Sequence, residues 1–327
     1  MKKYGHILPA AIILVILGIS LAKTLQREKQ LHSDSALLMD TLVEVSVWGE
    51  GRVSAEAGVD SALAAIARID TLLGDARVDT KSDRRIVESS EFREIMAVAG
   101  KVCRLTGGLF DPTVGSVTRL WNFGESVVPP EPDSIRAALT HVGLARFLAA
   151  GDSERFILDL GGVAKGYAVD LAARKLVALG FTSAIVVGGG DMRLVGKRPD
   201  GKPWRIAIRH PRRQGSFIGY LDLEDTAVAT SGDYERCFIY RGRRYHHILD
   251  PRTGMPSGAS TSVTVVSPSG ALCDALATGL FLLGPQAGLE LAGSLDDVNA
   301  VFVYADGESL VVTPGLAGRF ERASLEP

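Results

Sequence analysis

Hydrophobic and polar positions alternate with two different periods along this chain. Apolar residues fall on every second position over Leu42–Trp48, which predicts a strand, and they follow helical spacing over Val53–Leu73 and Phe92–Leu105. The glycine pair Gly107-Gly108 then ends the second of these helices. We therefore expect the N-terminal part of the fold to contain one strand followed by two helices.

The stretch after this glycine pair has no regular period and is polar and aromatic at once. It runs through Asp111-Pro112-Thr113 and Leu120-Trp121-Asn122-Phe123-Gly124 to the prolines Pro129, Pro130 and Pro132. Long irregular segments inside compact domains are often functional. We therefore predict a loop that faces a ligand.

The remainder of the chain is mainly strands. A short strand, a glycine turn and a helix run from Phe156 to Leu179, and a later helix is predicted over Ala271–Leu283. The segments with strand length and turn residues at their ends are Ser183–Val187, Trp204–Ile208, Ile218–Asp222, Ala227–Thr230, Phe238–Tyr240, Tyr245–Leu249, Ser262–Val266, Val301–Tyr304 and Leu310–Val312. Consecutive strands with segregated helices predict an α+β fold of mostly antiparallel strands with packed helices, and not a doubly wound parallel sheet.

Composition and charge narrow the class of protein. The 327 residues are 46% hydrophobic and 23% charged, which is a globular composition, and the formal net charge is −2. No basic surface is available to neutralise a nucleic-acid backbone, so nucleic acid is not expected as a partner. The three cysteines, Cys103, Cys237 and Cys273, lie far apart in apolar patterns. They indicate core residues and no zinc site, and they leave one disulfide open.

Residues 1–22 have the pattern of an export signal. Lysines at positions 2 and 3 precede an apolar run from Ile7 to Ala22, which is shorter than the ~20 residues of a comfortable membrane-spanning helix. The segment Ser20-Leu21-Ala22 offers the small residues that signal peptidase prefers. We expect either a cleaved signal peptide or an N-terminal membrane anchor. Both place the folded part outside the cytoplasmic membrane, on the periplasmic side.

Two further segments complete the expected organisation. A polar linker is predicted over residues 23–35, and one folded domain over residues 36–327. No internal repeat with solenoid spacing is visible.

A glycine turn between strand and helix is the first candidate site. Asp159 ends the strand, Gly161 and Gly162 form the turn, and Lys165 lies in the first turn of the helix. Backbone N–H groups and the positive end of the helix dipole at such a junction suit a phosphate. The spacing is not that of a Walker P-loop, because Lys165 precedes Gly166. A phosphorylated ligand is the hypothesis, and a tight connection without a ligand is the alternative.

Asp274 and Thr278 are the second candidate, because helical spacing places their side chains on one face, one turn apart. Carboxylate and hydroxyl oxygens are hard ligands, and Mg²⁺ usually takes one or two protein carboxylates while phosphates and water supply the rest. The alternative is structural: Asp274 would cap the helix and Thr278 would bond back to a carbonyl.

Two adjacent histidines form the third candidate. The side chains of His246 and His247 must point to opposite faces of a strand, so only one can serve a given site. That histidine could take a proton from an attacking hydroxyl or bond a phosphate oxygen, and a structural role is the alternative. The turns over residues 188–191 and 229–236 are rich in small polar residues suited to ring nitrogens, carbonyls or ribitol hydroxyls.

Seven segments taken in order resemble the ApbE family, the FAD:protein FMN transferases, over roughly Met39 to Pro285. The segments are Asp111-Pro112-Thr113-Val114-Gly115, Leu120-Trp121-Asn122-Phe123-Gly124, 159–166, Gly189-Gly190-Asp191, 229–236, 247–254 and 274–278. The resemblance implies a T-fold-like α+β architecture, FAD as substrate and Mg²⁺ as cofactor. It also implies transfer of FMN from FAD to a threonine hydroxyl of a target protein, with release of AMP.

The resemblance also implies roles for individual residues. The magnesium ligands would be Asp274, Thr278 and the backbone carbonyl of Gly162, and His247 would activate the acceptor hydroxyl. The residues that would contact FAD are Met39, Trp121, Asn122, Phe123, Asp159, Lys165 and the main chain near Ile248. The chain departs from the family pattern in two places: Met39-Asp40-Thr41 replaces Met-Gly-Thr, and the usual serine-to-asparagine stretch is not found within Leu73–Ile86.

Three functions stay open at this level. The first is the flavin transferase, with a membrane redox-complex subunit as the expected acceptor. The second is a magnesium-dependent FAD pyrophosphatase, in which water replaces threonine. The third is a flavin-binding protein without turnover.

Overall fold

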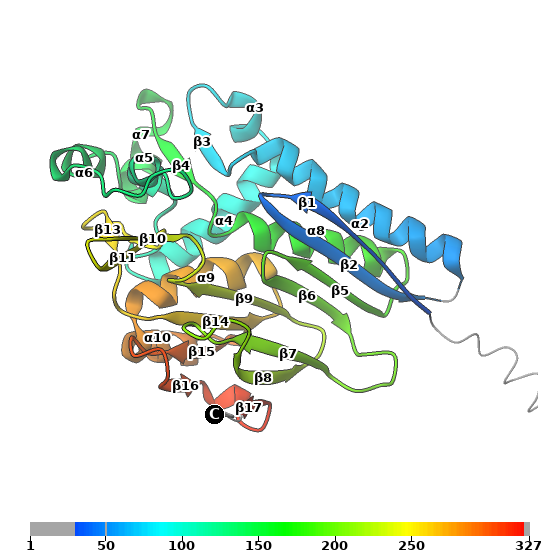
Figure 1. Cartoon of the computed structure of the whole chain (residues 1–327). Coiled ribbons are helices and arrows are strands. Elements are labelled where there is room, and N and C mark those ends of the chain that lie inside the picture. Colours follow the sequence, from blue (N-terminus) through cyan, green and yellow to red (C-terminus); the bar gives the residue numbers. More distant parts are fainter. Residues whose placement is uncertain (1–29, 50, 324–327) are drawn as a thin grey trace, which may run out of the picture.

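A computed structural model describes residues 30–49 and 51–323, and its centre is one eight-stranded sheet in which every neighbouring pair is antiparallel (Figure 1). In spatial order the strands are β1 (Gln30–Leu38), β2 (Thr41–Gly49), β5 (Ser183–Gly188), β6 (Asp191–Gly196), β9 (Ala227–Gly232), β14 (Ser262–Ser267), β15 (Asn299–Val303) and β16 (Leu310–Val312). The predicted antiparallel α+β fold is confirmed.

Helices cover one face of this sheet. The helices that pack directly on it are α2 (Arg52–Leu73), α8 (Ala164–Ala178), α9 (Gly270–Leu283) and α10 (Pro285–Gly293), and α4 (Ser90–Leu105) packs against α9. Because strand side chains alternate, Val43, Val45 and Val47 of β2 all point to the helices and are fully buried. The period of two in the sequence therefore identifies the residues on the face of β2 that the helices cover.

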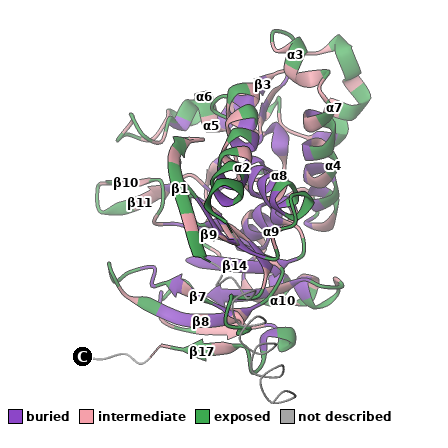
Figure 2. Ribbon diagram, turned by 90° about the vertical axis from the view of Figure 1, so that its right-hand side faces the viewer, coloured by how far each residue is buried: buried purple, intermediate pink, exposed green. Residues whose placement is uncertain are grey.

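A second, three-stranded sheet covers part of the opposite face. Its strands are β7 (Trp204–Arg209), β8 (Phe217–Leu223) and β17 (Phe320–Arg322). Its apolar side chains pack against the alternate residues of the central strands, such as Leu194, Val228 and Val301. Strand β14 lies between the two layers, and all six of its residues are buried (Figure 2).

Short elements connect the larger ones, and most of them lie beyond one end of the central sheet (Figure 1). They are β3 (Arg77–Asp79), α3 (Arg84–Val87), η1 (Pro112–Val114), α5 (Gly115–Trp121), α6 (Pro132–Leu139), α7 (Leu144–Ala150), η2 (Gly151–Ser153), β4 (Ile157–Asp159), β10 (Cys237–Tyr240), β11 (Arg243–His246), β12 (Leu249–Asp250), β13 (Met255–Pro256) and η3 (Pro314–Leu316). Strands β3 and β4 pair with each other, as do β10 with β11 and β12 with β13.

Several predictions at the level of elements were wrong. The predicted linker extends to residue 35, but residues 30–35 belong to β1, because they pair in register with β2. The predicted irregular stretch contains α5 and the start of α6. The predicted strand Tyr245–Leu249 is interrupted at His247, whose backbone N–H donates to Arg236 while Leu249 pairs with a different strand.

The prediction for the cysteines is wrong in part, and the prediction for the start of the chain falls on residues that are not described. Cys103, Cys237 and Cys273 are free thiols, and Cys237 is only half-buried, so it is not the core residue that was predicted. The predicted signal peptide or anchor over residues 1–22 and the first part of the linker lie outside the described residues. Among the residues that are described, no helix combines the length and apolarity needed to cross a bilayer.

Candidate active site

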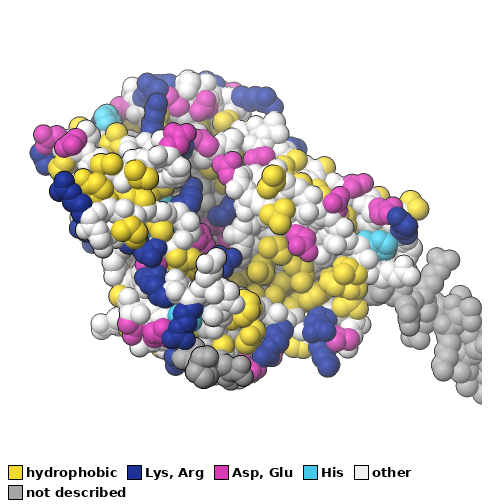
Figure 3. Space-filling view, in the orientation of Figure 1, with side chains coloured by type: hydrophobic (Ala, Val, Ile, Leu, Met, Phe, Trp, Pro, Cys, Tyr) yellow, Lys and Arg dark blue, Asp and Glu magenta, His cyan; other side chains and the backbone are white. Residues whose placement is uncertain are grey.

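A cavity of ≈ 540 Å³ opens where the β1–β2 turn, the glycine turn before α8 and the helix α9 meet. Figure 3 shows the face on which the surface is hollowed, with basic and acidic side chains inside the hollow. All of the predicted site residues except Trp121 line it. They are Met39, Asn122, Phe123, Asp159, Gly162, Lys165, His247, Ile248, Asp274 and Thr278. Residues far apart in the sequence are thus brought to one place.

Trp121 lies behind the cavity wall. Its side chain is fully buried, its Nε1 donates to the carbonyl of Gly254 at 2.8 Å, and its ring stacks on Phe123 with a centroid separation of 5.3 Å. Trp121 therefore has no exposed surface for the predicted direct contact with FAD. Trp121 instead fixes the orientation of Phe123, whose ring forms the wall.

The β1–β2 turn brings Met39 to the cavity. Met39 and Asp40 have φ values of 53° and 56°, the left-handed conformation of a two-residue hairpin turn. The Met39 N–H donates to Asp70 Oδ1 at 3.0 Å, so the turn is tied to helix α2.

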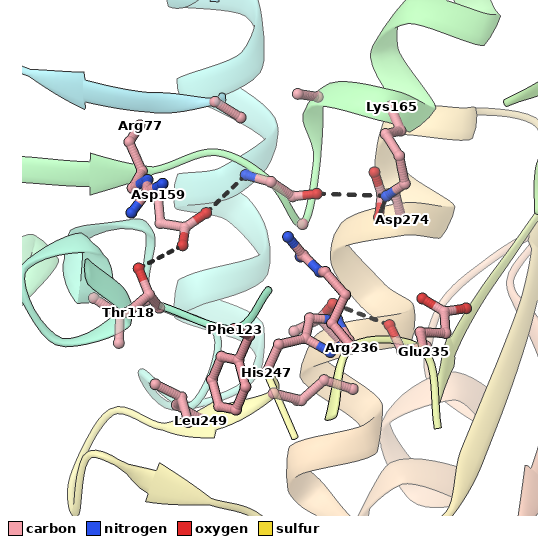
Figure 4. Close-up of a pocket in the computed structure, with 18 of the residues that line it drawn as sticks. Arg77, Thr118, Phe123, Asp159, Lys165, Glu235, Arg236, His247, Leu249 and Asp274 are labelled. Carbon is pink, nitrogen blue, oxygen red and sulfur yellow. Dashed lines mark hydrogen bonds and ion pairs between the residues drawn. The ribbon is translucent and has the colours of Figure 1, made fainter. Parts of the chain in front are cut away.

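Asp159 shapes the glycine turn. Its Oδ1 accepts from the Gly161 N–H at 2.9 Å and its Oδ2 accepts from the Thr118 hydroxyl at 2.7 Å (Figure 4). Both carboxylate oxygens thus have protein donors, and the side chain links β4 to α5. Asp159 therefore positions the turn in addition to lining the cavity.

Helices α8 and α9 approach closely beside this turn. A Cβ atom built on Gly166 would lie 2.1 Å from the Gly270 carbonyl oxygen, so only glycine fits there. The close approach lets the Gly166 N–H donate to Asp274 Oδ2 at 3.0 Å. The N-cap of α9 is Ser269, which accepts from the Leu272 N–H. The alternative in which Asp274 caps its own helix is therefore excluded.

The oxygens proposed as metal ligands lie near the point where α8 and α9 approach each other. A Cβ atom built on Gly162 would lie 3.4 Å from Thr278 Oγ1, which places that hydroxyl beside the glycine turn. The Thr278 hydroxyl bonds the Ser231 hydroxyl at 3.0 Å and not a backbone carbonyl of its own helix. Because the Gly166 N–H is used by Asp274, no backbone amide among the described residues donates to the Gly162 carbonyl. One carboxylate, one hydroxyl and one unused carbonyl suit a hard cation.

A cluster of conventional metal ligands is absent from the described part of the chain. Over residues 30–49 and 51–323, no three or more His, Cys, Asp or Glu side chains are grouped so that they could hold a metal ion. A metal here would therefore depend on the hydroxyl and the carbonyl as well as on Asp274.

Lys165 lies between two carboxylates in the cavity. Its Nζ is 3.6 Å from Asp274 Oδ1 (Figure 4). The same Nζ is 3.2 Å from Asp191 Oδ2. Burial alone would lower the pKa of Lys165, but the charges of Asp191, Asp274 and Glu235 raise it above its usual value. Lys165 therefore stays protonated.

The sequence did not single out Asp191 and Glu235 as charges of this site. Burial, followed by repulsion from Asp274, raises the pKa of Asp191 above that of an ordinary carboxyl. Burial also raises the pKa of Glu235, which Lys165 and Arg236 partly offset. Repulsion from Asp274 contributes to both raised pKa values, so a cation bound beside these carboxylates would be favourable. The glycine-rich turn before Asp191 was the signal that could have identified it.

The side chains of the two adjacent histidines lie in different environments. His246 is buried against Phe281, and its Nε2 lies 2.7 Å from the Ser257 carbonyl oxygen, so it is structural. His247 lines the cavity, and its Nδ1 is buried without a hydrogen-bond partner among the described residues. Burial, followed by the charges of Arg236, His246 and Lys165, holds the pKa of His247 well below its usual value. The imidazole of His247 is therefore neutral at pH 7 and able to accept a proton.

Comparison with known proteins decides the family. The model of the ApbE family matches residues 39–302, which span the whole cavity. The chain belongs to the ApbE family.

Individual relatives of this ApbE chain agree in sequence and in fold. It is 32% identical over 309 residues to the FAD:protein FMN transferase of Haemophilus influenzae, covering 86% of this chain and 89% of that protein. It is 35% identical over 249 residues to the enzyme of the same name from Vibrio cholerae, covering 68% and 75%. The crystal structure of the ApbE protein from Thermotoga maritima matches with a TM-score of 0.76 at 28% identity, covering 89% and 99%.

One of the two departures from the ApbE pattern lies at the cavity wall. The segment in which the serine-to-asparagine stretch was not found does reach the cavity, because residues 74–77 line it. There, Arg77 pairs with Asp75 at 2.6 Å. This ApbE chain therefore presents a compensated ion pair at that part of the wall.

Proposed function

We propose that this chain transfers the FMN half of FAD to a threonine hydroxyl of a target protein in a magnesium-dependent reaction that releases AMP. One observation carries the proposal: in a chain of the ApbE family, three hard oxygens and a neutral histidine line the same cavity. The volume is within the range of ligand sites.

The residues that would hold the metal are Asp274, Thr278 and the Gly162 carbonyl. A bound Mg²⁺ would neutralise charge on the diphosphate of FAD. Met39, Asn122, Phe123 and Ile248 would contact FAD along the wall, with Phe123 held in place by Trp121. The glycine turn shaped by Asp159 lets phosphate oxygens approach the main chain, because Gly161 and Gly162 carry no side chain, and Lys165 adds positive charge.

His247 supplies the base in this proposal. The acceptor oxygen forms a bond to the FMN phosphorus, and the bond from that phosphorus to the bridging oxygen of AMP breaks. The proton of the acceptor hydroxyl passes to the neutral imidazole of His247. Since phosphoryl-type transfer depends mainly on positioning and charge, the fixed glycine turn and the ammonium of Lys165 are the main protein contributions besides the base.

One experiment separates the three functions. The protein is incubated with FAD, Mg²⁺ and an acceptor protein, the acceptor mass is measured, and AMP is quantified in parallel. Transfer predicts an FMN-sized mass gain with equimolar AMP. Formation of AMP and free FMN without an acceptor would instead show a pyrophosphatase, and retention of FAD without AMP would show a binding protein.

A variant of a proposed metal ligand tests whether AMP release depends on the metal. Asp274→Asn keeps an oxygen to accept from Gly166 but removes the charge, so magnesium-dependent AMP release is expected to be lost while the fold remains. Asp296→Asn makes the same change at an exposed position and is expected to retain activity. Full activity of Asp274→Asn would remove Asp274 from the metal site.

We also propose where the reaction takes place. The apolar run before Ala22 supports export or anchoring in the inner membrane, with a membrane redox-complex subunit as acceptor. Mass spectrometry of the protein isolated from the membrane and periplasmic fractions tests this. A cytoplasmic protein with residues 1–22 intact would contradict it.

A further inference from the structure

The hairpin over residues 237–246, which we call the basic ribbon, stands at the rim of the cavity. It consists of β10 and β11, and among the described residues no other strand pairs with either of them. The residues directly before and after it, Arg236 and His247, both line the cavity. The ribbon therefore begins and ends at the proposed site of chemistry.

Aromatic contacts fix one face of the ribbon to the cavity wall. Phe238 and Tyr245 stack across the two strands with centroids 5.5 Å apart, and Phe238 lies 5.8 Å from the Phe123 ring. An isolated two-stranded hairpin is marginally stable in water. These contacts hold the ribbon in one orientation, and they couple it to the wall that Trp121 supports.

The tip of the ribbon carries positive charge that is not compensated. Arg241 lies over the Tyr240 ring and Arg243 over the Tyr245 ring, each 5.2 Å from the centroid, and both arginines are exposed. Neither forms an ion pair with a carboxylate of the described residues. Nearby Arg252, in contrast, is paired with Asp250 at 2.7 Å.

The other face of the ribbon exposes an apolar side chain. Ile239, opposite Arg244 in the register, leaves 59% of its surface accessible to solvent. This combination of fixed cations, an exposed apolar side chain and open strand edges is typical of a surface that binds an extended segment.

We propose that the basic ribbon docks the acceptor protein by binding an extended acidic segment next to the hydroxyl that receives FMN. The inference rests on the proposed transferase function and names the recognition chemistry of that reaction. Arginine guanidinium groups held on aromatic rings suit carboxylates, which they bind through paired hydrogen bonds. A segment bound along the ribbon reaches the cavity at its base, where His247 lies.

Binding is measured separately from chemistry, so that the two proposals can fail independently. A short fluorescein-labelled peptide in which aspartates flank one threonine is titrated with the protein, and fluorescence anisotropy gives Kd. A second peptide carries lysines in place of the aspartates. The double variant Arg241→Glu/Arg243→Glu is expected to weaken binding of the acidic peptide by about tenfold or more and to strengthen binding of the basic one.

Two matched variants complete the experiment. Arg174→Glu makes the same change at another exposed arginine that lies over a tyrosine ring, on α8, and is expected to leave Kd unchanged. Arg241→Lys/Arg243→Lys keeps the charge and is expected to retain most of the binding. Equal Kd values for the acidic and basic peptides, or for the unaltered protein and the charge-reversed double variant, would overturn the docking proposal. An FMN mass gain on the acidic peptide would support the transferase function whatever the Kd values are.

Discussion

Asp40 occupies a backbone conformation that most L-residues avoid. Its φ of 56° follows the 53° of Met39 in the β1–β2 turn, where a glycine would be unstrained. We expect Asp40→Gly to change the free energy of unfolding by less than about 1 kcal/mol, because relieved strain offsets added chain entropy. Asp40→Val is expected to destabilise the fold by about 1–2 kcal/mol. Urea unfolding of both variants tests this, and equal stabilities would argue against the strained turn.

His247 is the residue on which the proposed chemistry depends most. We expect His247→Gln to lower the rate of FMN transfer roughly 10²–10⁴-fold while changing the affinity for FAD much less, because the lost function is that of a base. Rates at saturating FAD and a separate FAD titration provide the measurement. His141→Gln, at an exposed histidine, is the control. An equal loss of both quantities would make His247 a ligand contact instead.

The same histidine links stability to pH. Its folded-state pKa is lowered mainly by burial, so the unfolded chain binds more protons than the folded one once the pH falls below about 6.5. The free energy of unfolding should therefore decrease from about pH 6.5 toward the folded-state pKa, and His247→Gln should flatten that part of the profile. Urea titrations across this range test the sign, and an unchanged slope in the variant would contradict it.

At the residue scale, the sequence predicted local pairs better than distant ones. Asp274 and Thr278 could be placed on one face because both belong to one helix with a fixed period. The pairing of Lys165 with Asp191 depends on how α8 crosses the turn between β5 and β6, which no local pattern encodes. The burial of Trp121 behind Phe123 was missed for the same reason.

At the scale of elements, long periodic segments were predictable and short ones were not. Helices α2, α4, α8 and α9 have apolar residues at helical spacing and a glycine after the last turn, so their existence was predicted correctly. Helix α5 has only seven residues, and strand β1 is polar and largely exposed because only one edge of it pairs. Their structure comes from tertiary contacts that composition does not reveal.

The crossing of α8 over α9 gives a prediction at this scale. Gly166→Ala would place a Cβ atom 2.1 Å from the Gly270 carbonyl oxygen, so the helices must separate. We expect a loss of about 1–3 kcal/mol in stability, together with weaker metal binding because Asp274 moves. Gly293→Ala, in α10 where no atom lies within 4 Å, is expected to be neutral or slightly stabilising. Thermal unfolding and Mg²⁺ titration compare the two, and similar effects of both would exclude the close crossing.

For the whole molecule, metal binding should appear as added stability. At Mg²⁺ a hundredfold above its Kd, binding to the folded state alone contributes about 2.7 kcal/mol, which corresponds to roughly 4 °C in Tm for a domain of this size. EDTA should remove this shift. Thr278→Val should lose it and Thr278→Ser should keep it, because only the hydroxyl is a proposed ligand. A full shift in Thr278→Val would show that the metal binds elsewhere.

The burial of β14 between two layers has a consequence for how a flavin enters. Its neighbour β9 carries Thr230 and Ser231, which line the floor of the cavity, so the floor belongs to the most enclosed part of the molecule. Amide protons in β14 should exchange with deuterated solvent only when the entire domain opens. A bulky dinucleotide must then enter from the opposite, open side of the cavity, between the peripheral turns and hairpins, while the base stays closed.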